Sequence, residues 1–233
     1  MKILSIDSSS VSASASVTEN GATLAEAFMN NGFTHSETLM PMVKKVVSSS
    51  KISVSDIDLL AITNGPGSFT GVRIGIASAK GICDAANIPC IAVSTLEAIA
   101  KPLCESDVLA VAVMDARCNQ VYTASFYKGE RKTADRAILV SDLLSELKAE
   151  KKPIVLIGDG ADMCFEKMKD ELSNLSVAED EVKLIHASYI GKIAEEKIQK
   201  GEEAIKSENL LPFYLRLPQA ERELNNKNKG VKQ

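Results

Sequence analysis

The sequence predicts an α/β protein made of two similar lobes. Two stretches share one design, in which an apolar strand ends on an aspartate, a polar turn follows, and a second strand alternates small and apolar residues. The first stretch runs from Ile3 to Val17 and contains Asp7, and the second runs from Val108 to Tyr127 and contains Asp115. In each half a third short strand and a helix come next. Because one unit occurs twice in the same order, we expect two lobes that meet at a cleft, and a single mixed sheet with an incidental second hairpin is the alternative.

The first half contains clear helix and turn signals. Asn20-Gly21 is typical of a hairpin turn, Thr34-x-x-Glu37 and Ser94-x-x-Glu97 are typical of helix starts, and Gly65-Pro66-Gly67 interrupts an apolar run. The expected order is strands over 2–7, 12–18 and 22–29, a helix from 34, a strand over 57–63, a helix over 70–86, a strand over 91–93, and a short helix from 94 to 100.

The second half repeats this order with little residue identity. We expect strands over 108–114, 121–127, 137–139 and 154–157, with helices from 141, near 163–172 and over 188–200. The predicted division is a first lobe over 1–104, a second lobe over 105–220, and a polar tail over 221–233.

Composition limits the function. The 233 residues carry 27 basic and 31 acidic side chains, a net charge of −4, with no Trp and 4% aromatic residues. A chain that holds a phosphate backbone by itself usually has a basic surplus and stacking aromatics, so independent nucleic-acid binding is not expected. Five cysteines without a C-x-x-C pair argue against a disulfide framework and against a zinc site. No leader-like or membrane-spanning apolar run is found, so a cytoplasmic protein without a membrane role is expected.

The most specific local signal is the segment Gly65-Pro66-Gly67-Ser68-Phe69-Thr70-Gly71-Val72-Arg73-Ile74-Gly75. It joins a strand to a helix, where backbone amides favour anions. It is neither a Walker P-loop nor an esterase elbow, because the lysine and the flanking glycines of those motifs are missing. Arg73 lies near a helix N-terminus, where its charge opposes the helix dipole, so a carboxylate or another anionic partner is expected for it.

Small residues recur every four positions in the predicted 70–86 helix. Gly71, Gly75 and Ala79 form one track. A glycine within a helix costs about 1 kcal/mol relative to alanine, so close approach of another helix is the expected reason for these residues. That helix is either the apolar side of residues 39–47 in this chain or a helix of another chain, and both readings remain open.

Asp7 and Asp115 end corresponding strands, and aspartates that face each other across a cleft suit a phosphate–metal site. However, both turns lack the glycines that let a backbone approach phosphate. We therefore expect at most a vestigial phosphate or nucleotide cleft at Asp7, Ser8, Ser9, Gly65, Gly67, Ser68 and Asp115. An independent ATP-binding phosphotransferase or ATPase is the alternative function.

Histidines are scarce. The chain has only His35 and His186, and the residue four positions after His35 is Leu39, so no His-x-x-x-His metal pair exists. No metal site is predicted, and a metallopeptidase is poorly supported.

With these residues in view, the chain resembles the TsaB (YeaZ) family, glycoprotease-like relatives of the TsaD (Kae1-like) proteins. The match runs nearly to Ala220, and the 65–75 segment is its most specific part. The other matching motifs are weak alone: Ile6-Asp7-Ser8-Ser9, His35-Ser36-Glu37, Ser94-Thr95-Leu96-Glu97, Asp115-Ala116-Arg117, Val121-Tyr122 and Pro212-x-Tyr214-Leu215-Arg216.

The resemblance implies a duplicated actin/Hsp70-like (ASKHA, ribonuclease H-like) fold. It implies a non-catalytic subunit for threonylcarbamoyladenosine formation at position 37 of ANN-decoding tRNAs. In the family this subunit binds and activates TsaD as a heterodimer, the ATPase TsaE joins the pair, and the subunit alone forms homodimers. Catalysis is expected in TsaD, tRNA is reached only through the complex, and the resemblance leaves room for ATP or ADP at the partner interface.

The resemblance also carries a partner-binding face onto two helices. Its residues are His35, Glu37, Leu39, Met42, Val43, Val46, Thr70, Val72, Arg73, Ile74, Gly75 and Ala79. A Gly75→Leu substitution is then expected to abolish binding of TsaD while leaving the monomer folded.

Overall fold

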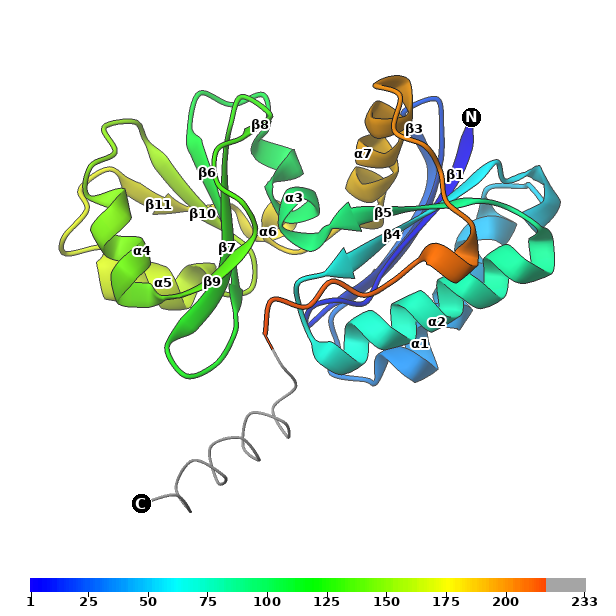
Figure 1. Ribbon diagram of the computed structural model, residues 1–233, viewed down its shortest axis with the longest axis horizontal. Coiled ribbons are helices and arrows are strands. Elements are labelled where there is room, and N and C mark those ends of the chain that lie inside the picture. The colour runs from blue at the N-terminus through cyan, green and yellow to red at the C-terminus, as the bar shows by residue number, and fades with distance from the viewer. Residues whose placement is uncertain (217–233) are drawn as a thin grey trace, which may run out of the picture.

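The computed structural model describes residues 1–216, which form two β-sheets side by side (Figure 1). Residues 217–233, and with them the predicted polar tail, lie outside the described part. The first sheet has the strand order β3-β2-β1-β4-β5. Its strands are β1 (Lys2–Asp7), β2 (Ala13–Glu19), β3 (Ala22–Met29), β4 (Leu59–Gly65) and β5 (Cys90–Ser94). The first three are antiparallel neighbours, whereas β4 and β5 run parallel to β1.

The second sheet repeats this arrangement. The order along it is β9-β7-β6-β10-β11, and a short strand, β8, also pairs with β7. Its strands are β6 (Leu109–Asp115), β7 (Gln120–Tyr127), β8 (Glu130–Arg131), β9 (Arg136–Leu139), β10 (Ile154–Ile157) and β11 (Leu175–Val177). As in the first sheet, an antiparallel hairpin is followed by two parallel strands. The predicted duplication is confirmed, and the alternative of a single mixed sheet is wrong.

Helices cover both faces of each sheet. In the first lobe α1 (His35–Ser49) and α2 (Phe69–Ala86) lie on one face, and α7 (Ala187–Gln199) lies on the other (Figure 1). In the second lobe α4 (Val140–Leu147) and α5 (Ala161–Met168) pack on the outer face. The remaining helical pieces are α3 (Thr95–Ala100), α6 (Asp180–Lys183) and the 3₁₀ turns η1 (Val54–Asp56), η2 (Lys101–Leu103) and η3 (Ser207–Asn209).

The two lobes share one central core. Helix α3 follows the first sheet in the chain but packs against β6 and β7, whereas α7 follows the second sheet but packs against β1 and β2. A single buried cluster therefore contains Ile3 from β1, Ile99 from α3, Ala112 from β6 and Ile190 from α7. The boundary predicted between residues 104 and 105 falls in the loop between η2 and β6.

Alternation of side chains explains how β1 serves two cores. Leu4 and Ile6 point to the cluster under α1 and α2, whereas Ile3 points to the cluster under α7. Ser5 also lies on the α7 face, where the helix presents Gly191. A Cβ on that glycine would be 2.9 Å from the Ser5 hydroxyl oxygen and 2.7 Å from that of Thr18, so only glycine allows this close approach.

The predicted helix starts were correct, but one cap differs. Ser94 accepts a hydrogen bond from the Glu97 amide at 3.3 Å, as expected of an N-cap. Thr34 precedes α1, yet its hydroxyl donates to the Glu37 carboxylate at 2.7 Å and accepts no amide, so no capping box forms there. Over residues 1–216, no helix has both the length and the apolar character needed to cross a bilayer.

Candidate functional site

A cleft of about 490 Å³ lies where the two lobes meet. Four segments far apart in the sequence line it, and each carries a motif singled out above. They are the β1–β2 turn, the β4–α2 loop, the β6–β7 turn with Asp159, and residues 213–216. The last of these belongs to residues 205–216, which follow α7, run along α2 and are called the C-terminal strap below (Figure 1).

Asp7 lies beneath the cleft and does not line it. The Oδ1 atom of this fully buried residue accepts hydrogen bonds from the Ser9 amide and hydroxyl, at 3.1 and 2.6 Å, and from the Thr63 hydroxyl. Oδ2 has no partner among the described residues. Burial raises the pKa of Asp7 above its usual value, and the hydrogen bonds from Ser9 and Thr63 oppose the rise. Asp7 and Asp115 therefore do not face each other across an open cleft, contrary to the prediction.

The glycines of the 65–75 segment let α2 pack onto the β1–β2 turn. A Cβ on Gly67 would overlap the Ser9 carbonyl oxygen, and one on Gly71 would overlap that of Ser8. A Cβ on Gly75 would be 2.6 Å from the Ser8 hydroxyl oxygen, which itself donates to the Gly71 carbonyl at 2.8 Å. Packing within the chain therefore explains this glycine track, but the neighbour is the β1–β2 turn and not the 39–47 helix that was expected.

Gly65 has a separate role, in binding the strap. It has φ +126°, and a Cβ there would overlap the carbonyl oxygen of Phe213. Beside it, the Phe213 amide donates to the Asn64 carbonyl at 2.7 Å. The glycine-rich segment and the C-terminal motif from Pro212 to Arg216 are therefore in direct contact.

Arg73 has no carboxylate partner among residues 1–216, and its contacts there are aromatic. Its Nε donates to the hydroxyl of Tyr214 at 2.9 Å, and its guanidinium lies 3.8 Å from the centre of the Phe69 ring. The Phe69 and Tyr214 rings stack with centres 4.7 Å apart. The strap supplies the partner that the sequence alone could not locate, because it lies 141 residues away.

The second-lobe wall of the cleft is acidic and closely hydrogen-bonded. The Asp115 amide donates to Asp159 Oδ1 at 3.1 Å, and the Arg117 guanidinium lies 3.3 Å from Asp115 Oδ2. Burial raises the pKa of Asp159 to about 6, and the nearby Asp115 carboxylate adds to the rise. Arg216 reaches across from the strap and donates to the Ala116 carbonyl. Asp159, which follows the strand predicted over 154–157, was not among the residues singled out from the sequence.

Six turn amides of the cleft are not free to bind the phosphates of a nucleotide, the ligand that this fold class suggests. A phosphate site at a turn needs free backbone amides. Here six turn amides donate within the chain, at 2.7 to 3.1 Å: those of Ser9, Ser68, Asp115, Ala116, Arg117 and Gly160. Within residues 1–216, no three His, Cys, Asp or Glu side chains come together as a metal-ion site would require.

The predicted partner face splits into two groups. Seven of its residues are buried in this chain: Leu39, Met42, Val43, Val46, Val72, Gly75 and Ala79. These positions help to hold α1 and α2 on the first sheet, and of the seven only Val43 also lines the groove described next. The partly or fully exposed residues are His35, Glu37, Thr70, Arg73 and Ile74. Of these, His35 has its Nε2 2.9 Å from the Ser10 carbonyl oxygen, next to the cleft.

An apolar groove of about 1100 Å³ lies between α1, α2 and the segment of Ile52 and η1. Sequence reasoning missed its floor on α2, where Ala77, Gly81 and Ala85 are exposed at four-residue spacing. Gly81 has no atom within 4 Å of the position that a Cβ would take. The α1 wall consists of Met40, Val43, Lys44, Val47 and Ser48. The sequence did contain a signal for this floor, because a second track of small residues runs along α2 beside the track of Gly71, Gly75 and Ala79.

The Gly75→Leu substitution expected to test partner binding is unsuitable, because Gly75 is packed inside the chain and does not line the groove. A leucine there would collide with Ser8 under α2, so loss of partner binding by Gly75→Leu would report damage to the fold. Gly81 faces open space in the groove, so a larger side chain at this position changes the surface without crowding the core.

Another polar cluster joins β3 to α7. Glu26 accepts the Ser188 amide at 2.8 Å, and its Oε2 lies 3.2 Å from Nδ1 of His186, whose ring stacks on Phe28. The hydrogen bonds from His186 and Ser188 lower the pKa of Glu26, against the opposing effect of burial. His186 thus has an acidic neighbour 160 residues away, which the sequence did not reveal.

The duplicated sheets, the inter-lobe cleft and the crossing helices define a protein of the actin/Hsp70-like class. Residues 32–224 match the family described as "TsaD: tRNA N6-adenosine threonylcarbamoyltransferase". The chain is 31% identical over 229 residues to the tRNA threonylcarbamoyladenosine biosynthesis protein TsaB of Bacillus subtilis, covering 95% of this chain and 96% of that one. It is also 31% identical over 223 residues to the Escherichia coli protein of the same name, covering 93% and 95%. The chain belongs to the TsaB (YeaZ) family.

Solved structures agree with this assignment. A Pseudomonas aeruginosa protein, described as uncharacterized with similarity to peptidase YeaZ, superposes with a TM-score of 0.77 at 25% identity over 92% of this chain and 99% of that one. An activator of 2-hydroxyisocaproyl-CoA dehydratase from Clostridium difficile, with bound ADPNP, superposes at 0.51 and 10% identity over 87% and 99%. The latter similarity concerns the fold alone. The predicted family and the predicted actin/Hsp70-like fold are confirmed.

Proposed function

We propose that this chain is an accessory subunit in the biosynthesis of threonylcarbamoyladenosine at position 37 of ANN-decoding tRNAs, and that it binds and activates a TsaD partner through the α1–α2 groove. The observation that carries the proposal is the groove itself. It is apolar, it lies beside two well-packed helices, and small residues on its floor permit close approach of a partner helix. Family membership supplies the pathway and the partner.

The groove residues take over the role assigned from sequence to the buried positions. The central contacts are proposed at Met40, Ala77, Gly81, Ile82 and Ala85, with the exposed residues Glu37, Thr70 and Ile74 at the margin. The same surface is proposed to form a homodimer when the chain is alone. Since a homodimer would cover the surface that TsaD needs, the two assemblies exclude each other.

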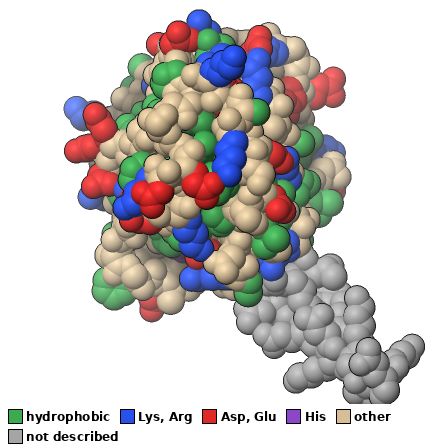
Figure 2. Space-filling model, turned by 90° about the vertical axis from the view of Figure 1, so that its left-hand side faces the viewer, with side chains coloured by type: hydrophobic (Ala, Val, Ile, Leu, Met, Phe, Trp, Pro, Cys, Tyr) green, Lys and Arg blue, Asp and Glu red, His purple; other side chains and the backbone are tan. Residues whose placement is uncertain are grey.

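The proposed subunit does not catalyse and does not hold tRNA by itself. Six turn amides of its cleft donate within the chain and Asp7 is buried, which supports catalysis in TsaD and weighs against the ATPase alternative. Charges of both signs alternate over the end formed by the second lobe (Figure 2), where Lys148 pairs with Glu171 and Lys169 with Glu166. Such a surface does not concentrate the positive charge that a phosphate backbone attracts.

The remaining parts of the proposal follow family membership. TsaE joins the pair of this chain and TsaD, tRNA is contacted through the complex, and ATP or ADP at the interface takes its phosphate contacts from the partners. The cytoplasm is the proposed location.

The experiment is reconstitution of tRNA modification with purified TsaD and TsaE, with this chain present or omitted. Omission is expected to abolish modification. Asp115→Asn, which changes an exposed carboxylate of the cleft, is expected to leave the rate unchanged, because no step is assigned to it. A rate that falls in Asp115→Asn while the complex still forms would contradict a non-catalytic role, and modification without the chain would contradict activation.

A further inference from the structure

We propose that the C-terminal strap is a latch that holds the two lobes closed over the cleft, with Arg216 as the contact that opens. The proposal concerns this chain alone and does not depend on the proposed partner. It rests on an unequal distribution of contacts: many between the strap and the first lobe, and one hydrogen bond between the strap and the second.

The strap is firmly attached to the first lobe along its length. Ile205 and Cys90 exchange two backbone hydrogen bonds of 2.8 Å, and Leu210 is fully buried. Further along, the Asn64 side chain donates to the Leu211 carbonyl at 3.2 Å, and the Phe213 amide donates to the Asn64 carbonyl at 2.7 Å. The strap therefore moves with the first lobe.

The end of the strap lies in the wall of the cleft and reaches the second lobe. Tyr214 is fixed by stacking on Phe69 and by the hydrogen bond from Arg73. Two residues later, the partly buried Arg216 donates to the carbonyl of Ala116, in the β6–β7 turn of the second lobe. Phe213, Tyr214, Leu215 and Arg216 all line the cleft, so the end of the strap forms part of its wall and joins the two lobes there.

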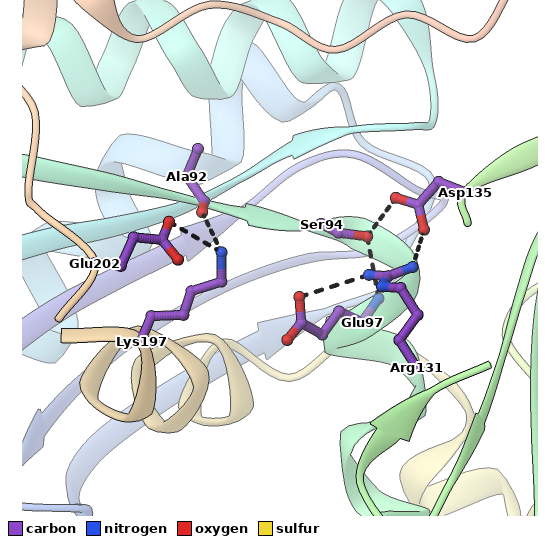
Figure 3. A network of polar contacts seen from close by, with 7 residues as sticks. All are labelled: Ala92, Ser94, Glu97, Arg131, Asp135, Lys197 and Glu202. Atoms are coloured by element: carbon purple, nitrogen blue, oxygen red, sulfur yellow. Dashed lines mark hydrogen bonds and ion pairs between the residues drawn. The ribbon is translucent and has the colours of Figure 1, made fainter. Parts of the chain in front are cut away.

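A stronger connection joins the lobes where β5 passes into α3 (Figure 3). There Ser94 donates to Asp135 at 2.6 Å, and Arg131 pairs with Asp135 and lies 3.6 Å from Glu97. Ser94 and Glu97 belong to the end of β5 and to α3, whereas Arg131 and Asp135 belong to β8 and the residues before β9. Together with the shared core under α3 and α7, this network acts as the hinge.

A hinge with many contacts and a latch with one predict rotation about the hinge when the latch is released. A hydrogen bond from a charged group is worth enough to shift a two-state population by about 10- to 100-fold. Loss of the Arg216 contact should therefore convert a closed molecule into one with a populated open state.

Spin labels on the two rims of the cleft can measure this motion. Cys118 is exposed at the tip of the β6–β7 turn, and Thr70→Cys places a second label on the first turn of α2. Cys104→Ser removes the half-buried thiol, and Cys83, Cys90 and Cys164 are buried. The full-length chain with these changes is expected to give one narrow distance distribution by pulsed electron–electron double resonance.

Arg216→Met is expected to add a second, longer distance, and Tyr214→Ala is expected to do the same by freeing the end of the strap. The matched control is Arg136→Met, which removes an arginine that pairs with Glu146 inside the second lobe. Circular dichroism and thermal melting show whether each variant is folded. An unchanged distribution in both folded strap variants would overturn the latch, as would an equal change in the Arg136 control.

Discussion

Asp159 offers a quantitative test of the cleft, through the dependence of stability on pH. Its carboxylate is held against the Asp115 amide in a largely buried position, and burial raises its pKa to about 6 from the usual 3.8. At about 1.4 kcal/mol for each pH unit, that difference corresponds to a free-energy cost on the order of 3 kcal/mol when the carboxylate is ionised in the folded protein. Asp159→Asn retains the side-chain oxygen that accepts the amide and removes the charge.

The sign follows from proton binding. Between pH 4 and pH 6 the folded state binds more protons at Asp159 than the unfolded state, so this group makes the protein less stable as pH rises through about 6. Asp159→Asn is therefore expected to be more stable than the parent chain at pH 7.5, by up to about 3 kcal/mol. The advantage should shrink between pH 6 and pH 4 and be absent below pH 4.

Urea unfolding at pH 4.0, 6.0 and 7.5, followed by circular dichroism, measures the difference in the free energy of unfolding. Asp162→Asn is the matched control, since its carboxylate is exposed on the same stretch of chain and pairs with Lys183 at the surface. The reasoning would be refuted if the difference in the free energy of unfolding between Asp159→Asn and the parent chain were the same at every pH. It would also be refuted if the parent chain were more stable than Asp159→Asn at pH 7.5.

Four further substitutions test the packing around the site and the network that joins the lobes. Gly81→Ala is expected to raise the free energy of unfolding by up to about 1 kcal/mol, because alanine favours the helix and the space around Gly81 is open. Gly75→Ala is expected to lower the free energy of unfolding, because the new Cβ would displace Ser8. Equal effects of the two substitutions in urea unfolding would contradict the packing of α2. Gly65→Ala is expected to release the strap, because the new Cβ would overlap the Phe213 carbonyl and the φ angle of this residue is positive. Hydrogen exchange of residues 205–216 should then be faster than in the parent chain. Unchanged protection of these residues would argue against the contact. Ser94→Ala is expected to cost about 1 kcal/mol by removing the cap of α3 together with the bond to Asp135, and a thermal melt equal to that of the parent chain would show that the hinge network adds nothing.

Most of the fold could be predicted because each element carries a local signal. Apolar runs that end on an aspartate indicated β1 and β6, alternation indicated β2 and β7, and the recurrence of strand, aspartate and turn revealed the duplication. The exchange of α3 and α7 between the sheets could not be predicted. It depends on which apolar face fits which sheet, as with Gly191 against Ser5 and Thr18, and chain order does not specify that contact.

The site was predicted less well, because its contacts join residues far apart in the sequence. The 65–75 segment was identified as important, but the reason for each glycine lies in partners such as Ser8 and Phe213. Helical periodicity also cannot tell which of two small-residue tracks faces inward. The inner track of Gly75 was assigned to the partner, and the outer track of Gly81 was passed over, although both have the same four-residue spacing.

The affinity of this chain for TsaD, measured by titration calorimetry with a Gly81→Leu variant, tests the central claim most directly. The leucine would project into the α1–α2 groove from a position with no neighbour within 4 Å, so the monomer should stay folded. Lys45→Leu is the matched control, because it adds the same side chain at an exposed position of α1 that does not line the groove. We predict that Gly81→Leu abolishes binding to TsaD and that Lys45→Leu binds as the parent chain does. Undiminished binding by a folded Gly81→Leu chain would contradict the account.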